Sequence, residues 1–158
     1  MDKLIRLLSE NSSYSLKELS LIIGDSEENI KAKIKEYEAN GIIKGYRAAI
    51  NWEQVQDAGV TAYIELKVTP TKDKGFDEIA EKIMAFDEVS SLYLMAGTYD
   101  LAVMVKAETI QDVSSFVTRK LAALDGVLAT ATHFILKRYK DEGVVLSEIP
   151  DDERCMQF

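Results

Sequence analysis

A strict alternation of side chains over residues 60–69 is the feature that most restricts how this chain can fold. Apolar residues take every second position and more polar ones lie between them, the apolar set being Val60, Ala62, Ile64, Leu66 and Val68. A period of two predicts a strand with one buried face and one exposed face. Pro70 then predicts the end of this strand, because proline cannot donate to a strand ladder.

The segments that follow predict an α+β domain of order βαββαβ. Apolar spacing favours helices at 76–83 and 109–124, with Thr109 and Asp112 capping the second, and strands at 88–96, 99–107 and 127–139. Gly97 and Thr98 suggest a two-residue hairpin turn. This order predicts a ferredoxin-like sandwich, with helices on one face of an antiparallel sheet. Self-association is expected to cover the other face, since the strand at 101–105 is apolar on both sides.

The first fifty residues predict three short helices. Apolar residues recur at helical spacing near Leu4, after the capping residue Ser15, and again from Ile30. Gly24 and Gly41 predict the ends of the second and third helices. Either Asp25 with Glu28 or Ser26 with Asn29 could cap the third.

The short turn at Gly24 predicts a helix-turn-helix, and the strand formers at 42–50 predict a small β-hairpin, or wing. We therefore expect a winged helix-turn-helix in residues 1–51, a linker at 52–59, a sandwich domain at 60–140 and a tail at 141–158.

Charge is distributed unevenly between these parts. The chain has a formal net charge of −8, but residues 1–50 carry eight basic and eight acidic side chains, against eleven and nineteen in residues 51–158. All the excess negative charge thus lies in the C-terminal part. Two domains with different partners explain this asymmetry, although a neutral N-terminal domain gives DNA binding only weak support.

Composition argues against several other classes. Charged residues interrupt every apolar stretch, so neither a membrane span nor an export signal is expected, and the location predicted is the cytoplasm. Cys155 is the single cysteine and His133 the single histidine, which leaves poor material for a disulfide, a metal site or a catalytic base. His133 is interpreted as a packed strand residue.

Two stretches resemble a known family. The first runs through Glu18-Leu19, Ser26, Ile30, Lys33, Ile34 and Glu38 into GIIKGYRAAIN (41–51), and the second is YLMAGTYDLAVMV (93–105). Together, in this order and spacing, they resemble the leucine-responsive/AsnC (Lrp/AsnC) transcription regulators over nearly the whole chain. Asp25 departs from the usual hydrophobic residue and Lys33 from the usual arginine.

The resemblance implies a regulator that binds double-stranded DNA, dimerises through its sheet, assembles further to octamers or related rings, and senses effectors that are usually amino acids. Periodicity alone leaves the outer face of the third helix as an ordinary solvated face, with pairs such as Glu27 and Lys31. The resemblance instead favours a DNA reader, because asparagine can bond adenine and lysine can bond guanine or phosphate. The expected DNA-binding residues are Ser26, Asn29, Lys31, Lys33, Lys35, Lys44 and Arg47.

An effector site is expected at the Gly-Thr-Tyr-Asp turn. Asp100 could pair with the ammonium of an amino acid, while backbone amides near Gly97 receive its carboxylate. The alternative is a structural turn in which Asp100 bonds its own backbone. Strand propensity explains Thr130 and Thr132 as well as hydroxyl donation does. The expected effector-binding residues are Gly97, Thr98, Tyr99, Asp100, Thr130 and Thr132.

Two other functions remain open. Some haem-pathway decarboxylases that act on sirohaem resemble this family in both domains, but they are expected to gather His and Arg around a tetrapyrrole, and this chain has one His and five Arg. A sensing or assembly module without DNA binding is the third possibility. The leading prediction is a regulator with no enzymatic activity, no cofactor and no metal.

Overall fold

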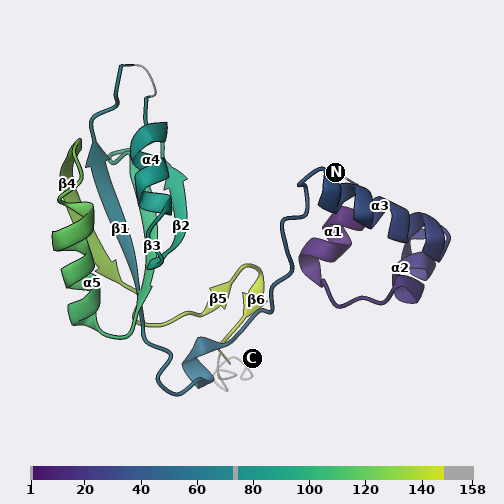
Figure 1. Ribbon diagram of the computed structural model, residues 1–158. Coiled ribbons are helices and arrows are strands. Elements are labelled where there is room, and N and C mark those ends of the chain that lie inside the picture. The colour runs from purple at the N-terminus through teal and green to yellow at the C-terminus, as the bar shows by residue number, and fades with distance from the viewer. Residues whose placement is uncertain (1, 73–74, 148–158) are drawn as a thin grey trace, which may run out of the picture. The chain divides into compact units, whose positions relative to one another are not determined.

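The computed structural model describes residues 2–72 and 75–147, which divide into two compact units (Figure 1). Residues 2–50 with 140–147 form a helical unit, and residues 51–72 with 75–139 form a sheet unit. The last residues of the expected tail, Cys155 among them, lie outside the described residues. In the described ranges, no helix has the length and apolar character needed to cross a membrane.

The helical unit contains the three predicted helices, α1 (Lys3–Glu10), α2 (Leu16–Ile23) and α3 (Glu27–Ala39). Ser15 caps α2 in a capping box, because its side chain accepts from the Glu18 N–H and the Glu18 carboxylate accepts from the Ser15 N–H. Gly24 ends α2 with a left-handed φ of +81°. Three residues separate α2 from α3, which confirms the helix-turn-helix.

One apolar core holds these helices together. Leu4, Leu7, Leu19 and Ile30 are buried, and Tyr37 packs against them from the side. The Tyr37 hydroxyl donates to the Asp2 carboxylate at 2.9 Å, and Asp2 also caps α1. The inner face of α3 is therefore fixed, and its outer face is left to solvent.

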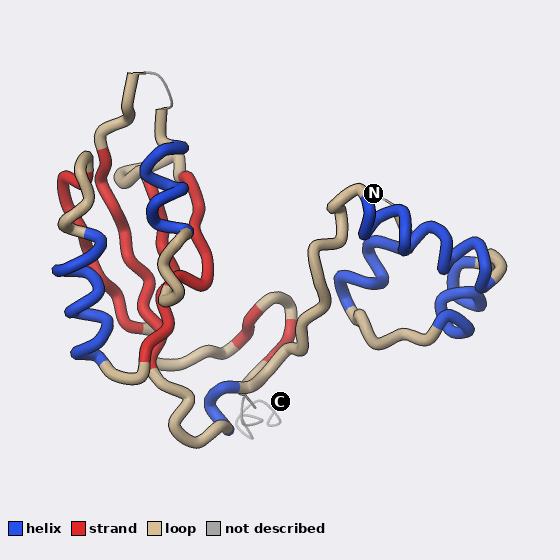
Figure 2. The backbone as a smooth tube through the Cα atoms, viewed as in Figure 1, coloured by secondary structure: helices blue, strands red, loops and turns tan. Residues whose placement is uncertain are grey.

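The β-hairpin predicted for residues 42–50 is wrong. Residues 43–50 contain no strand and run as an extended loop (Figure 2). Strand formers need a neighbouring strand for their backbone hydrogen bonds, and within the described residues no strand pairs with this segment. The described hairpin of this unit spans the predicted boundary between the sandwich domain and the tail instead, and pairs β5 (Lys140–Asp141) with β6 (Val144–Val145).

The sheet unit has the predicted order βαββαβ. Its elements are β1 (Val60–Val68), α4 (Asp77–Met84), β2 (Val89–Leu94), β3 (Leu101–Ala107), α5 (Ile110–Phe116) and β4 (Val127–Phe134). The strands pair antiparallel in the order β2-β3-β1-β4. Both helices cover the same face (Figure 1), so the ferredoxin-like prediction is confirmed.

The alternation along β1 creates the core of this unit. Ile64 and Leu66 are fully buried under the helices, against Ile83 of α4 and Val113 of α5. Burying each such side chain contributes roughly 1.5–3 kcal/mol to folding. The opposite side carries Thr61, Tyr63, Glu65 and Lys67, and no helix of the described residues covers it; we call this side the open face.

Several boundaries differ from the prediction. Thr109 and Asp112 form the expected capping box, but α5 ends at Phe116 and continues as a π-helical turn, Val117–Leu121. The expected linker begins with a short 3₁₀ helix, Trp52–Gln54. The last strand ends at Phe134, five residues earlier than predicted. Its pairing with β1 closes with one further backbone bond, from the Ile135 N–H to the Thr61 carbonyl at 3.0 Å.

Candidate nucleic-acid interface and effector site

Ser26 caps helix α3, as in the second of the two predicted arrangements, Ser26 with Asn29. The Ser26 hydroxyl accepts from the Asn29 N–H at 3.2 Å, and Glu27 and Glu28 follow in the first turn. Acidic residues there stabilise the positive end of the helix dipole. The Ser26 hydroxyl thus stabilises the start of α3 through its hydrogen bond with the Asn29 N–H.

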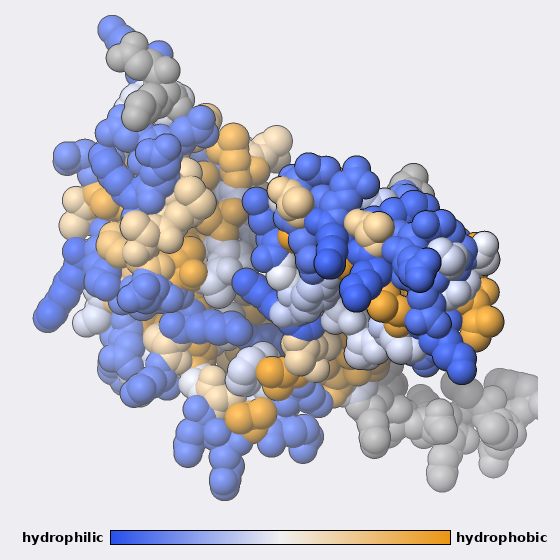
Figure 3. Space-filling view, turned by 45° about the vertical axis from the view of Figure 1, so that its right-hand side comes forward, coloured by the Kyte–Doolittle hydropathy of each residue, from blue (hydrophilic) through white to orange (hydrophobic). Residues whose placement is uncertain are grey.

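The outer face of α3 presents the predicted lysines. Lys31, Lys33 and Lys35 are all exposed. Lys33 lies 3.5 Å from the Asp25 carboxylate, whereas Lys31 and Lys35 form no ion pair with any residue that the structure describes. The face of the helical unit in view in Figure 3 is predominantly hydrophilic. Two cations are therefore free to meet an anionic partner.

Asn29 is held by Asp25, a contact that the sequence pattern does not predict. The Asn29 amide donates to the Asp25 carboxylate at 2.7 Å. Asp25 therefore contacts three of the predicted DNA-binding residues, Ser26, Asn29 and Lys33.

Lys44 and Arg47 lie on the extended segment rather than on a wing. Both are exposed. The Tyr46 hydroxyl donates to the Glu38 carboxylate at 2.9 Å and ties this segment to the end of α3. That bond keeps the two cations on an extended segment tethered to α3.

The turn that carries the expected effector residues is longer than predicted. Six residues, 95–100, connect β2 to β3, and the Met95 N–H closes the loop on the Asp100 carbonyl at 2.8 Å. Gly97 has open space where a side chain would begin. The Tyr99 and Tyr63 hydroxyls share a hydrogen bond on the open face, which, with burial, raises the pKa of Tyr63 to about 12.

The Asp100 carboxylate does not bond its own backbone; its partners lie on β1. It accepts from the Val68 N–H of β1 at 2.9 Å and from the Lys67 ammonium at 3.3 Å. The Val68 hydrogen bond, and secondarily Lys67, lower the pKa of Asp100. The charged aspartate therefore connects the end of β1 to the start of β3.

Thr130 and Thr132 lie on the other face of the sheet from Tyr99. Thr130 is opposite Leu66 and Thr132 is opposite Ile64, both of which point into the core. Directly opposed residues share a face. Both threonines therefore face the helix side. Within a single chain they do not lie near Tyr99.

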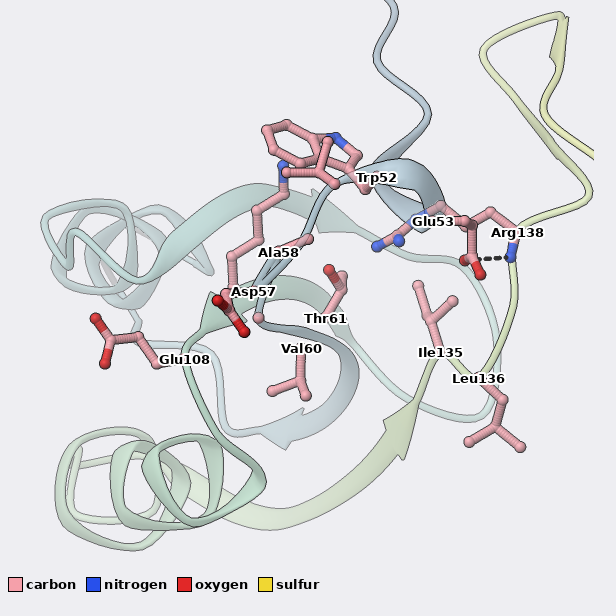
Figure 4. A pocket seen from close by; sticks show the side chains of 13 residues that line it. Trp52, Glu53, Asp57, Ala58, Val60, Thr61, Glu108, Ile135, Leu136 and Arg138 are labelled. Carbon is pink, nitrogen blue, oxygen red and sulfur yellow. Dashed lines mark hydrogen bonds between the residues drawn. The ribbon is translucent and has the colours of Figure 1, made fainter.

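A cavity of about 540 Å³ lies at the opposite end of β1, where the predicted linker folds back (Figure 4). Its lining mixes apolar side chains with charges of both signs, including Trp52, Lys106, Glu108 and Arg138. Lys106 lies over the Trp52 ring at 4.9 Å. Two residues of the predicted linker could have indicated that it is folded. They are Trp52, a large apolar side chain, and Gly59, which adopts a left-handed φ in the structure.

His133 is a strand residue of β4, as predicted, but its side chain is 57% exposed on the open face rather than packed. Its Nε2 is 3.6 Å from the Glu65 carboxylate, and its ring is tilted against Tyr63. Across residues 2–72 and 75–147, no cluster of His, Cys, Asp and Glu is suited to hold a metal ion.

Comparison with known proteins identifies both units. The family model of the "Lrp/AsnC ligand binding domain" matches residues 61–145, more than half of the chain. YugG of Bacillus subtilis, named an uncharacterized HTH-type transcriptional regulator, is 43% identical over 155 residues, which cover 98% of this chain and 93% of the relative. The HTH-type regulator LrpA of Pyrococcus abyssi is 30% identical over 88% of this chain and 96% of its own length.

Solved structures share the same architecture. A transcriptional regulator from Neisseria meningitidis, solved with L-Met, superposes with a TM-score of 0.71 at 26% identity, covering 89% of this chain and 93% of that one. AsnC of Escherichia coli superposes with a TM-score of 0.66 at 24% identity, covering 87% and 93%.

Proposed function

The chain belongs to the Lrp/AsnC family of transcriptional regulators, and we propose that it binds double-stranded DNA through α3 and responds to an amino-acid effector. The observation that carries the DNA-binding proposal is the pair Lys31 and Lys35. Both are exposed and lack ion-pair partners among the described residues, on a helix whose inner face is fixed in a core. A rigid helix with free cations has the chemistry needed in a major groove.

Different residues of the interface have different tasks. Asn29 and Lys33, on another side of the helix from Lys31 and Lys35, are proposed to read base edges, while Ser26 starts the helix. Lys44 and Arg47 are proposed to contact phosphate, which sets orientation rather than sequence preference.

The effector is proposed to bind at the 95–100 loop. Gly97 leaves its backbone open to a ligand, and Thr98 and Tyr99 add hydroxyls. The Neisseria meningitidis regulator was solved with L-Met, which supports an amino acid as the ligand class. Because Lys67 already pairs with Asp100, a ligand ammonium would share or replace that contact. Thr130 and Thr132 would come from a second subunit, since they face away from Tyr99.

Assembly is proposed to begin at the open face of the sheet. Tyr63, Tyr93 and Met104 expose apolar surface there without a covering helix, and a second sheet of the same kind would cover it. Dimers are proposed to assemble further, to octamers or related rings. An effector that prefers one assembly would shift DNA binding through the populations of these states.

The activity proposed is regulation rather than catalysis, in the cytoplasm and without a cofactor. The relatives named above are regulators, and His133 is engaged with Glu65 on the sheet rather than gathered with arginines in a pocket.

An electrophoretic mobility shift with DNA from upstream of the chain's own gene tests the DNA-binding proposal. We expect retarded complexes that survive an excess of unrelated DNA. Equal competition by unrelated DNA would reject a sequence-specific regulator, and no retardation at low salt would leave only the sensing or assembly role.

A further inference from the structure

Asp25 lies where α3 begins, and its carboxylate connects three groups of the proposed reader helix. It accepts from the Asn29 amide at 2.7 Å and from the Ser26 N–H at 2.8 Å, and it lies 3.5 Å from the Lys33 ammonium. Asp25, Asn29 and Lys33 are four residues apart, so they line one side of the helix. Lys31 is two residues from both Asn29 and Lys33, so it projects from a different side of the helix.

The carboxylate is anchored rather than loosely placed. The Ser20 hydroxyl of α2 donates to the Asp25 carbonyl at 2.7 Å, which fixes the backbone of this residue to the preceding helix. The side chain of Asp25 is 27% exposed, against 48% for Lys33. Donation from Asn29, and then from Ser26, lowers the pKa of Asp25, so the group is ionised at neutral pH.

An anchored carboxylate has a specific effect on an asparagine. The amide of Asn29 can in principle turn by 180°, which exchanges its donor and acceptor positions. A carboxylate only accepts, so Asp25 holds the amide nitrogen and directs the Asn29 oxygen to the other side. Base edges are distinguished by their donor and acceptor patterns, so a fixed amide offers a fixed pattern to the DNA.

The same carboxylate weakens contacts that do not depend on sequence. Lys33 in an ion pair attracts phosphate less than a free lysine, and Asp25 itself repels phosphate. Non-specific binding relies almost wholly on such phosphate attraction.

We propose that Asp25 is a positioning residue for DNA recognition: it orients Asn29 for one base and suppresses binding to unrelated DNA. The inference rests on the proposed function and adds the origin of its specificity. It reverses the usual expectation for a DNA-binding surface, because loss of this aspartate should make the protein bind DNA more tightly and less selectively.

The test compares Asp25→Ala with Glu27→Ala. Both remove one negative charge near the start of α3, but within the described residues the Glu27 side chain forms no hydrogen bond or ion pair with Asn29 or Lys33. Fluorescence anisotropy gives the Kd for the operator from the chain's own upstream region and for an unrelated duplex of equal length. Melting temperatures verify folding, and Asp25→Asn, which keeps the shape of the side chain, serves if Asp25→Ala unfolds.

We expect Asp25→Ala to bind the unrelated duplex several-fold more tightly, and its ratio of specific to non-specific affinity to fall about tenfold, within the range that one bidentate base contact provides. Glu27→Ala should shift both affinities alike and keep the ratio. In the background of Asn29→Ala, removing Asp25 should change the ratio no further. An unchanged ratio in Asp25→Ala, or an equal fall in Glu27→Ala, would overturn the proposal. If the wild-type chain binds the operator and the unrelated duplex with equal affinity, the proposed function itself is wrong. The role of Asp25 in specificity is then wrong as well.

Discussion

The Asp100 carboxylate accepts the Val68 N–H at 2.9 Å, although these residues are 32 positions apart. The bond extends the β1–β3 ladder by one contact beyond the pair of Leu66 and Leu101. Lys67 lies beside the same carboxylate. A side chain that accepts a backbone hydrogen bond at the end of a strand ladder stabilises the sheet, whether or not it also binds a ligand.

We therefore predict that Asp100→Ala lowers the melting temperature more than Lys67→Ala does. The first change leaves the Val68 N–H without its acceptor, whereas the second removes only an exposed ion pair, which contributes little. The pKa of Asp100 is lowered in the folded chain, so its stabilisation is complete above the unfolded value of about 4 and is lost as pH falls through the folded value. The difference between wild type and Asp100→Ala should accordingly narrow below about pH 4. A difference that stays constant to pH 2 would contradict this account.

Salt dependence reports the phosphate contacts of α3. Lys31→Ala and Lys35→Ala should each reduce the slope of log affinity against log salt by about 0.9, because each lost contact releases one counterion fewer. Lys82→Ala in α4 of the sheet unit is the matched control and should leave the slope unchanged. If the two α3 variants keep the wild-type slope, α3 does not lie against the DNA backbone.

Gly97 allows the effector site to be tested without disturbing the fold. A methyl group at Gly97 meets no atom within 4 Å, and this residue does not need a left-handed conformation. Gly97→Ala should thus keep the melting temperature but lose the stabilisation that an amino acid such as L-Met gives the wild type, because the methyl would occupy the ligand's place. Gly45→Ala, equally open, is the control. Full ligand stabilisation in Gly97→Ala would remove the loop from the effector site.

Assembly through the open face can be blocked by one charge. Ala131 is an exposed residue of β4 opposite Glu65, so Ala131→Arg should fold but prevent a second sheet from packing there. Ser114→Arg places the same charge on the exposed side of α5. Light scattering should find smaller particles only for Ala131→Arg. Identical masses for both variants and the wild type would show that the open face is not the interface.

Local patterns predicted most of the fold. Ser15 and Gly24 mark the limits of α2 because caps act within one turn of the chain. The alternation in β1 marks its buried face because the period of a strand is built into its backbone. These signals need only neighbouring residues, so they can be interpreted without the structure.

Contacts between distant residues could not be predicted in this way. The bond of Asp100 to Val68 depends on the register of β1 against β3, and the side of Thr130 depends on its pairing with Leu66. The hairpin expected at 42–50 failed for the same reason, since strand propensity does not supply a pairing partner. The contact of Asp25 with Asn29 is local, but aspartate and asparagine at this place are also typical of helix caps, so the pattern alone does not reveal the contact.

The most direct test of the central claim is a DNase I footprint of the wild-type protein on the region upstream of its own gene. A dimer with two copies of α3 should protect an imperfect palindrome whose half-sites lie about 10 bp, or a multiple of this, apart. Asn29→Ala should lose this protection while keeping its melting temperature. A clear, periodic footprint would agree with a DNA-binding regulator that reads sequence through α3; no protection at low salt, or equal protection by Asn29→Ala, would contradict it.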